Sequence, residues 1–167
     1  MPIGGSTLQK LAAFAELDIT EMLDVGHDTP VVGDLDQPIV IDAVAAAALA
    51  SWHGLVAAIL DSVLAELPAS ADATVARLWP EHFDAAFDAA TSPGDRVNLG
   101  GSPGDGYSDE PYLYVGPFSS ARPGDADFWN APFGATRTRS ELVAGGGEAG
   151  LVASGAAFLL DGYGRLS

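Results

Sequence analysis

The chain has 167 residues, 48% of them hydrophobic and 18% charged, the composition of a globular protein long enough to bury one core. Its net charge of −16 repels phosphate backbones and anionic lipid surfaces, which excludes nucleic acids and membranes as expected partners. Because cysteine is absent, disulfides, thiolate nucleophiles and cysteine-bound zinc are excluded as well. The first residues lack the basic and apolar regions of a signal peptide, so we expect a cytoplasmic protein.

The first 40 residues predict one short helix followed by irregular chain. Ser6 or Thr7 can cap a helix that runs to about Leu17, because apolar residues recur there at helical spacing. Residues 24–38 contain Gly, Pro and Asp at the intervals typical of a loop. Residues 38–41 are apolar and predict a short extended segment.

A long helix is predicted in the centre of the chain. Asp42 is a suitable N-cap for a helix from Ala43 to about Leu67, and Pro68 ends it. Apolar residues cover nearly the whole circumference of this helix, which predicts burial on two sides. We place it in the centre of the domain, with a homodimer contact as the alternative.

The residues after this helix change from helical to alternating periodicity. Along residues 82–88, the apolar side chains Phe83 and Phe87 alternate with the polar side chains His82 and Asp84. A period of two is typical of a strand with one buried face, so Phe83 and Phe87 are predicted to face the core.

Repeated turn sequences divide the rest of the sheet region. Tetrapeptides of the form Ser/Arg-Pro-Gly-Asp occur at residues 92–95, 102–105 and 122–125. Proline favours the second position of a turn, and glycine accepts a positive φ at the third. Further strands are predicted at residues 96–100, 111–118 and 133–138.

The order of elements predicts an α+β fold, in which a small antiparallel β-meander packs on the long central helix with flanking terminal helices. A short helical turn at residues 140–143 precedes the last helix at about 148–161. We expect one domain over residues 1–167, with a helical part to about residue 70 and a sheet part over about 76–138.

Five short sequence words resemble those of a bacterial protein family to which no activity is assigned. The resemblance covers roughly residues 36–142. The five words are Leu78–Asp84, Ser102–Asp105, Glu110–Pro117, Phe128–Asn130 and Phe133–Ala135, in this order. The resemblance implies no catalytic residue, and it leaves the cofactor unknown.

The candidate site lies on the polar face of the predicted strand at residues 82–88. On a strand, His82 and Asp84 point to the same side, about 6.5–7 Å apart. Neighbouring strands then add an amide or guanidinium group and a phenol, a set that suits acid–base catalysis or binding of a sugar or carboxylate. A solvated face whose side chains bond one another is the other interpretation. The ligand-binding candidates are Trp79, Glu81, Arg96, Asn98, Tyr112 and Tyr114.

Two functions are open at this point. The first is a module that binds a small molecule or a protein near His82 and Asp84. The second is a hydrolase or isomerase, metal-assisted or not, in which His82 is the general acid or base and Asp84 orients it. No metal ligands are assigned, because the acidic residues 105–110 do not match a calcium loop and the three histidines follow no metal-binding motif.

Overall fold

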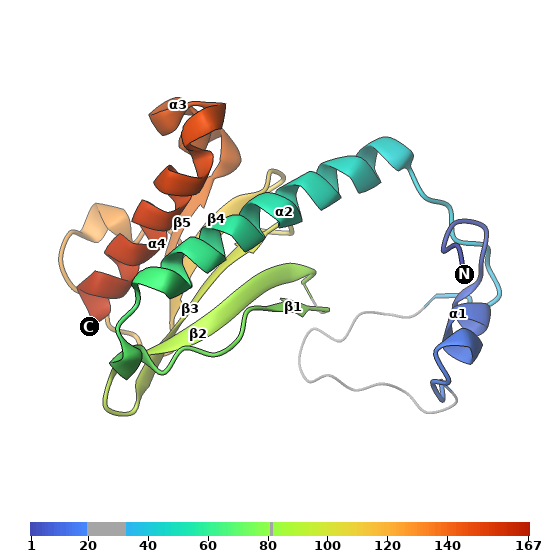
Figure 1. Ribbon diagram of the computed structural model, residues 1–167, viewed down its shortest axis with the longest axis horizontal. Coiled ribbons are helices and arrows are strands. Elements are labelled where there is room, and N and C mark those ends of the chain that lie inside the picture. Colours follow the sequence, from blue (N-terminus) through green and yellow to red (C-terminus); the bar gives the residue numbers. More distant parts are fainter. Residues whose placement is uncertain (20–32, 81) are drawn as a thin grey trace. The chain divides into compact units, whose positions relative to one another are not determined.

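The computed structural model describes residues 1–19, 33–80 and 82–167, and the chain divides into two compact units, Met1–Ala48 and Leu49–Ser167. The boundary between these two residue ranges falls within helix α2, Ala43–Glu66, which Figure 1 labels. The organisation as one domain stays a prediction.

The first unit contains helix α1, Leu8–Phe14. The predicted cap is confirmed, because the Thr7 side chain accepts a hydrogen bond from the Lys10 N–H at 3.2 Å. The helix ends three residues before the predicted Leu17, and Glu16 adopts a positive φ of 56°. Most of the loop predicted at residues 24–38 lies outside the described residues.

Helix α2, Ala43–Glu66, agrees with the sequence-based prediction at both ends. Asp42 Oδ1 accepts hydrogen bonds from the N–H groups of Val44 (2.8 Å) and Ala45 (3.0 Å), the arrangement of an N-cap. The helix is long and apolar enough to cross a membrane, a property that the core helix of a soluble protein shares. Its buried residues are Trp52, Val56, Ile59, Leu60 and Val63.

Five antiparallel strands form one open sheet in chain order, which confirms the predicted meander and the α+β fold (Figure 1). The strands are β1 Arg77–Trp79, β2 Asp84–Ser92, β3 Asp95–Ser102, β4 Tyr112–Pro117 and β5 Ala135–Thr138. The third-position glycines of the three turn tetrapeptides, Gly94, Gly104 and Gly124, all have positive φ, as the turn chemistry predicts.

The start of the sheet differs from the prediction. Strand β2 begins at Asp84, and the short strand β1, which the sequence pattern did not reveal, pairs with it through Trp79 and Asp84. Phe83 lies in the connection between the two strands with a φ of 56°, and its side chain is 44% exposed. The prediction that Phe83 faces the core is therefore wrong, whereas Phe87 is 1% exposed.

The C-terminal segment forms two helices, α3 Arg139–Gly146 and α4 Leu151–Leu166. Thr138 and Glu141 form a reciprocal capping box at the start of α3. Helix α4 continues beyond the predicted end at residue 161 despite two glycines, because tertiary packing holds its last turn. There the Tyr163 hydroxyl donates a hydrogen bond to the Ala90 carbonyl at 3.0 Å. Short 3-10 helices occur at Ala69–Ala71, Ala126–Phe128 and Glu148–Gly150.

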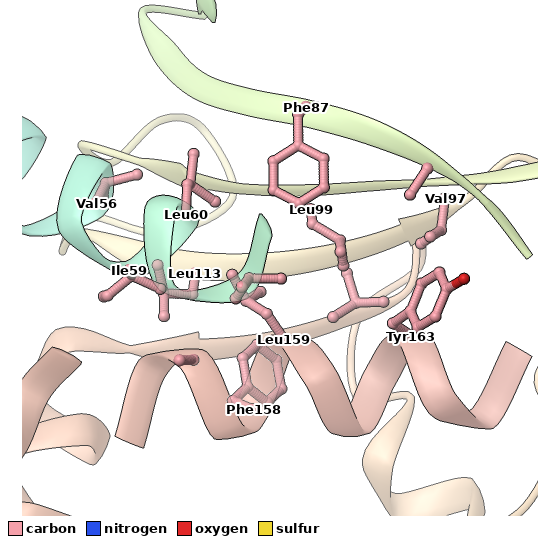
Figure 2. Packing of buried hydrophobic residues seen from close by; sticks show 14 of the residues in the cluster. Val56, Ile59, Leu60, Phe87, Val97, Leu99, Leu113, Phe158, Leu159 and Tyr163 are labelled. Carbon is pink, nitrogen blue, oxygen red and sulfur yellow. The ribbon is translucent and has the colours of Figure 1, made fainter. Parts of the chain in front are cut away.

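Helices α2 and α4 pack on the same face of the sheet and enclose the hydrophobic core (Figures 1 and 2). Glycines allow this close packing: a Cβ at Gly101 of β3 would lie 2.6 Å from Val56 of α2, and one at Gly155 of α4 would lie 2.5 Å from Ile59. The largest fully buried side chains include Ile59, Leu60, Phe87, Leu99, Leu113 and Leu159. The opposite face of the sheet carries the polar residues.

Candidate functional site

Alternate residues of the sheet point away from the helices and form a polar outer face. The strand register places Ala86, Gly100 and Tyr114 next to one another across strands β2, β3 and β4. One step along, Ser102 pairs with Tyr112. This periodicity brings side chains from three strands to one surface.

The centre of this face is a bond between Tyr114 and Asp84. The Tyr114 hydroxyl on β4 donates a hydrogen bond to Asp84 Oδ2 at the start of β2, although β3 lies between these strands. The bond passes over Gly100, where a Cβ would lie 2.7 Å from both the Cζ and the hydroxyl oxygen of Tyr114. Only glycine leaves room for the phenol to cross the middle strand. Asp84 is 8% exposed, so its carboxylate is largely removed from solvent.

The electrostatics of this pair keep the phenol protonated. Burial raises the pKa of Tyr114, and the neighbouring negative charge of Asp84 and the hydrogen bond to it raise it further. Tyr114 is therefore a hydrogen-bond donor and not a base at neutral pH.

A second tyrosine–aspartate pair lies beside the first. The Tyr112 hydroxyl donates to Asp105 Oδ2 at 2.7 Å, and the rings of Tyr112 and Tyr114 are 6.3 Å apart. Burial by itself would raise the pKa of the Asp105 carboxyl. The hydrogen bonds from Tyr112 and from the N–H groups of Tyr107 and Ser108, with the charge of His82, outweigh burial and lower this pKa.

An electrostatic interaction links His82 to the Asp105 carboxylate of this second pair. His82 is exposed and lies in the connection between β1 and β2, two residues before Asp84. The prediction that His82 and Asp84 share one face of a single strand is wrong, because the strand begins only at Asp84.

Exposed aromatic rings border the two pairs. Tyr107, in the connection from β3 to β4, makes edge contacts with Tyr112 and Phe133 at centroid distances of 5.6 and 5.0 Å. Trp79 is 43% exposed and pairs with Asp84 in the β1–β2 register. Asp105 and Tyr107 were not among the site residues predicted from the sequence. The turn tetrapeptide at residues 102–105 did predict a loop between the strands that form β3 and β4, and both residues lie in that loop.

Two predicted site residues lie elsewhere on the sheet. Arg96 pairs with Ala90 and Asn98 pairs with Asp88, so the prediction that either lies across from Asp84 is wrong. The register of a hairpin follows from its turn, and the turn after Ser92 brings Asp84 next to the Ser102 end of β3. The Arg96 guanidinium forms ion pairs with Asp88 and, at 3.4 Å, with Asp72. The candidate Glu81 lies outside the described residues.

The outer face can accept hydrogen bonds better than it can donate them. Both carboxylates act as hydrogen-bond acceptors: Asp84 accepts from the Tyr114 hydroxyl, and Asp105 accepts from the Tyr112 hydroxyl and from the N–H groups of Tyr107 and Ser108. In the part of the chain that the structure describes, no group of three or more His, Asp or Glu side chains is arranged to hold a metal ion. The arrangement therefore suits a ligand that carries several hydrogen-bond donors.

Comparison with known proteins gives no relative for this chain: no family model, no curated protein and no solved structure matches it. The resemblance of the five sequence words to a bacterial family stays a prediction.

Proposed function

We propose that the protein is a small-ligand-binding module whose site is the tyrosine–aspartate face, defined as Asp84, Asp105, Tyr112 and Tyr114. The observation that carries this proposal is the Asp84–Tyr114 bond across Gly100. A buried carboxylate is costly to desolvate, and a pair built from two non-adjacent strands fixes its oxygens in position before a ligand arrives.

The ligand class that fits this face best is a neutral polyhydroxylated molecule such as a sugar. Its hydroxyl groups would donate to the carboxylate of Asp105 at the rim of the face, and its ring would lie against Trp79 or Tyr107, which are both exposed. A carboxylate ligand, the other class that the sequence suggested, would be repelled by the two aspartates of this face. The face therefore favours the sugar.

The alternative is a hydrolase or isomerase with His82 as general acid or base and Asp84 as its orienting partner. The binding function is favoured because the Asp84 side chain is buried and accepts the hydrogen bond of Tyr114, while His82 is exposed in the connection between β1 and β2. The proposal is separated from this alternative by His82→Ala: the module keeps ligand affinity within a few-fold, and the enzyme loses turnover of its substrate.

Tyr114→Phe is expected to abolish the stabilisation that a sugar ligand confers on the wild type. A ligand at 100 times its dissociation constant stabilises the fold by about 2.7 kcal/mol, which a thermal unfolding scan against a sugar panel detects. Without the hydroxyl group of Tyr114, the Asp84 carboxylate loses its hydrogen bond and can move, so its oxygens no longer have a fixed position. Tyr163→Phe is the matched control, since it removes one hydroxyl bonded to Ala90 on the helix side of the sheet. If no sugar stabilises the wild type, or if Tyr114→Phe responds like Tyr163→Phe, the proposal fails.

Alkaline pH is expected to destabilise the wild type more than Tyr114→Phe. The folded-state pKa of Tyr114 is raised above its ordinary value of 10.0, so the unfolded chain loses this proton first as the pH rises. The stabilisation is fully present below pH 10.0 and is lost above it, by about 1.4 kcal/mol per pH unit for one group. Urea unfolding at several pH values between neutral and strongly alkaline measures the difference. Equal pH dependence of the two proteins would contradict the assignment.

A further inference from the structure

A hollow of about 290 Å³ lies between β5, α3 and α4, on the helix side of the sheet and thus away from the tyrosine–aspartate face. Its size is near the lower limit for ligand pockets, which suits a molecule of a few carbon atoms. The residues that line it include Arg137, Glu141, Leu142, Ser154, Phe158 and Asp161.

The guanidinium group of Arg137 is the distinctive feature of this hollow. It lies over the ring of Phe158 with its Cζ 5.1 Å from the ring centroid. Within residues 1–19, 33–80 and 82–167, it makes no hydrogen bond or ion pair, whereas Arg96 and Arg165 are paired with aspartates. Arginine has five N–H donors in a rigid fork, so Arg137 offers a preoriented group to an incoming acceptor.

The two acidic residues of the hollow are engaged with other groups. Glu141 Oε2 accepts hydrogen bonds from the Thr138 N–H at 2.8 Å and from the Thr138 hydroxyl at 3.2 Å, within the capping box of α3. Both carboxylate oxygens of Asp161 accept from Arg165, at 3.2 and 3.0 Å. Neither carboxylate forms an ion pair with Arg137, although this chain has 23 acidic and only seven basic residues.

We propose that this hollow binds a small aliphatic carboxylate. The two carboxylate oxygens would take the fork of Arg137 in a bidentate pair, the strongest arrangement for this side chain. Ser154 on α4 supplies a hydroxyl that makes no hydrogen bond with any residue the structure describes. The alkyl chain of the ligand would pack on Leu142 and Phe158. The position of Arg137 on β5 and of the ring on α4 sets the geometry of the site.

The test is an NMR titration of the wild-type protein with butyrate and, in parallel, with butyramide, its uncharged isostere. We expect butyrate to shift the amide resonances of the lining residues saturably and to bind at least tenfold more tightly than butyramide. Arg137→Gln should lose this preference, and Arg137→Lys should weaken binding, because lysine keeps the charge but lacks the fork. Arg122→Gln is the control, because Arg122 also lies over an aromatic ring, at 5.5 Å from that of Trp129, but does not line this hollow.

Equal affinity for butyrate and butyramide would overturn the proposal, and so would undiminished butyrate binding by Arg137→Gln. Absence of any saturable shift in the wild type would overturn it too. The comparison of the two ligands uses the unmodified protein, so it stands even if a substitution at Arg137 disturbs folding. The sugar-binding proposal concerns the other face of the sheet, and neither result depends on the other.

Discussion

Replacing Phe87 by alanine is expected to destabilise the protein by about 3–5 kcal/mol, the usual loss for a large core aromatic residue. Phe87 lies at the centre of β2, is 1% exposed, and points between the strands and helices α2 and α4 (Figure 2). Its removal leaves a cavity that the rigid surroundings of Leu60 and Leu99 fill only in part. Urea unfolding of the two proteins measures the free-energy difference.

Phe83→Ala is the matched control for this prediction. The two residues are of one type and four positions apart, and the alternation in the sequence gives them the same face. In the structure Phe83 is 44% exposed and contacts the ring of His53 at a centroid distance of 5.4 Å. We expect a loss of about 1 kcal/mol or less. Similar losses for both variants would mean that Phe83 is in the core and that β2 begins earlier than Asp84.

Replacing Gly134 by alanine is expected to destabilise the fold by about 3 kcal/mol or more, because the added methyl group has no room. A Cβ at Gly134 would lie 1.9 Å from the carbonyl oxygen of Val115, which is backbone and has no alternative rotamer. Gly134 also closes the turn before β5 by exchanging two hydrogen bonds with Ala131, at 3.0 and 3.1 Å. To avoid the clash, either this turn or the pairing of β4 with β5 must open. Thermal unfolding measures the loss.

Gly54→Ala serves as the control, since it makes the same chemical change in open space. No atom lies within 4 Å of a Cβ placed at Gly54, which is inside helix α2. Alanine in a helix interior is favoured over glycine by about 0.5–1 kcal/mol, so this variant should be slightly more stable than the wild type. A tolerated alanine at Gly134 would show that the chain there does not approach β4 as closely as the structure has it.

The candidate site was predicted in part. The sequence predicted that Asp84 shares a sheet face with a tyrosine of a later strand, and Tyr114 fulfils this role. The prediction that Arg96 or Asn98 lies across from Asp84 was wrong. An alternating pattern indicates which face of the sheet a side chain occupies, but not which residue of the neighbouring strand lies beside it. The pairing with Asp105 was missed because it depends on how the connection from β3 to β4 folds back over Tyr112.

The features that the sequence alone determined are those that local chemistry controls. Helix α2 begins at the side chain of Asp42 and ends before Pro68, and the Pro-Gly turns separate the strands of the meander, because caps and turns depend on a few neighbouring residues. The tertiary structure decided the rest. The crossing of Tyr114 over Gly100 and the extension of α4 to Leu166 depend on residues far apart in the chain, which meet only when the sheet and helices pack. No local pattern encodes that packing.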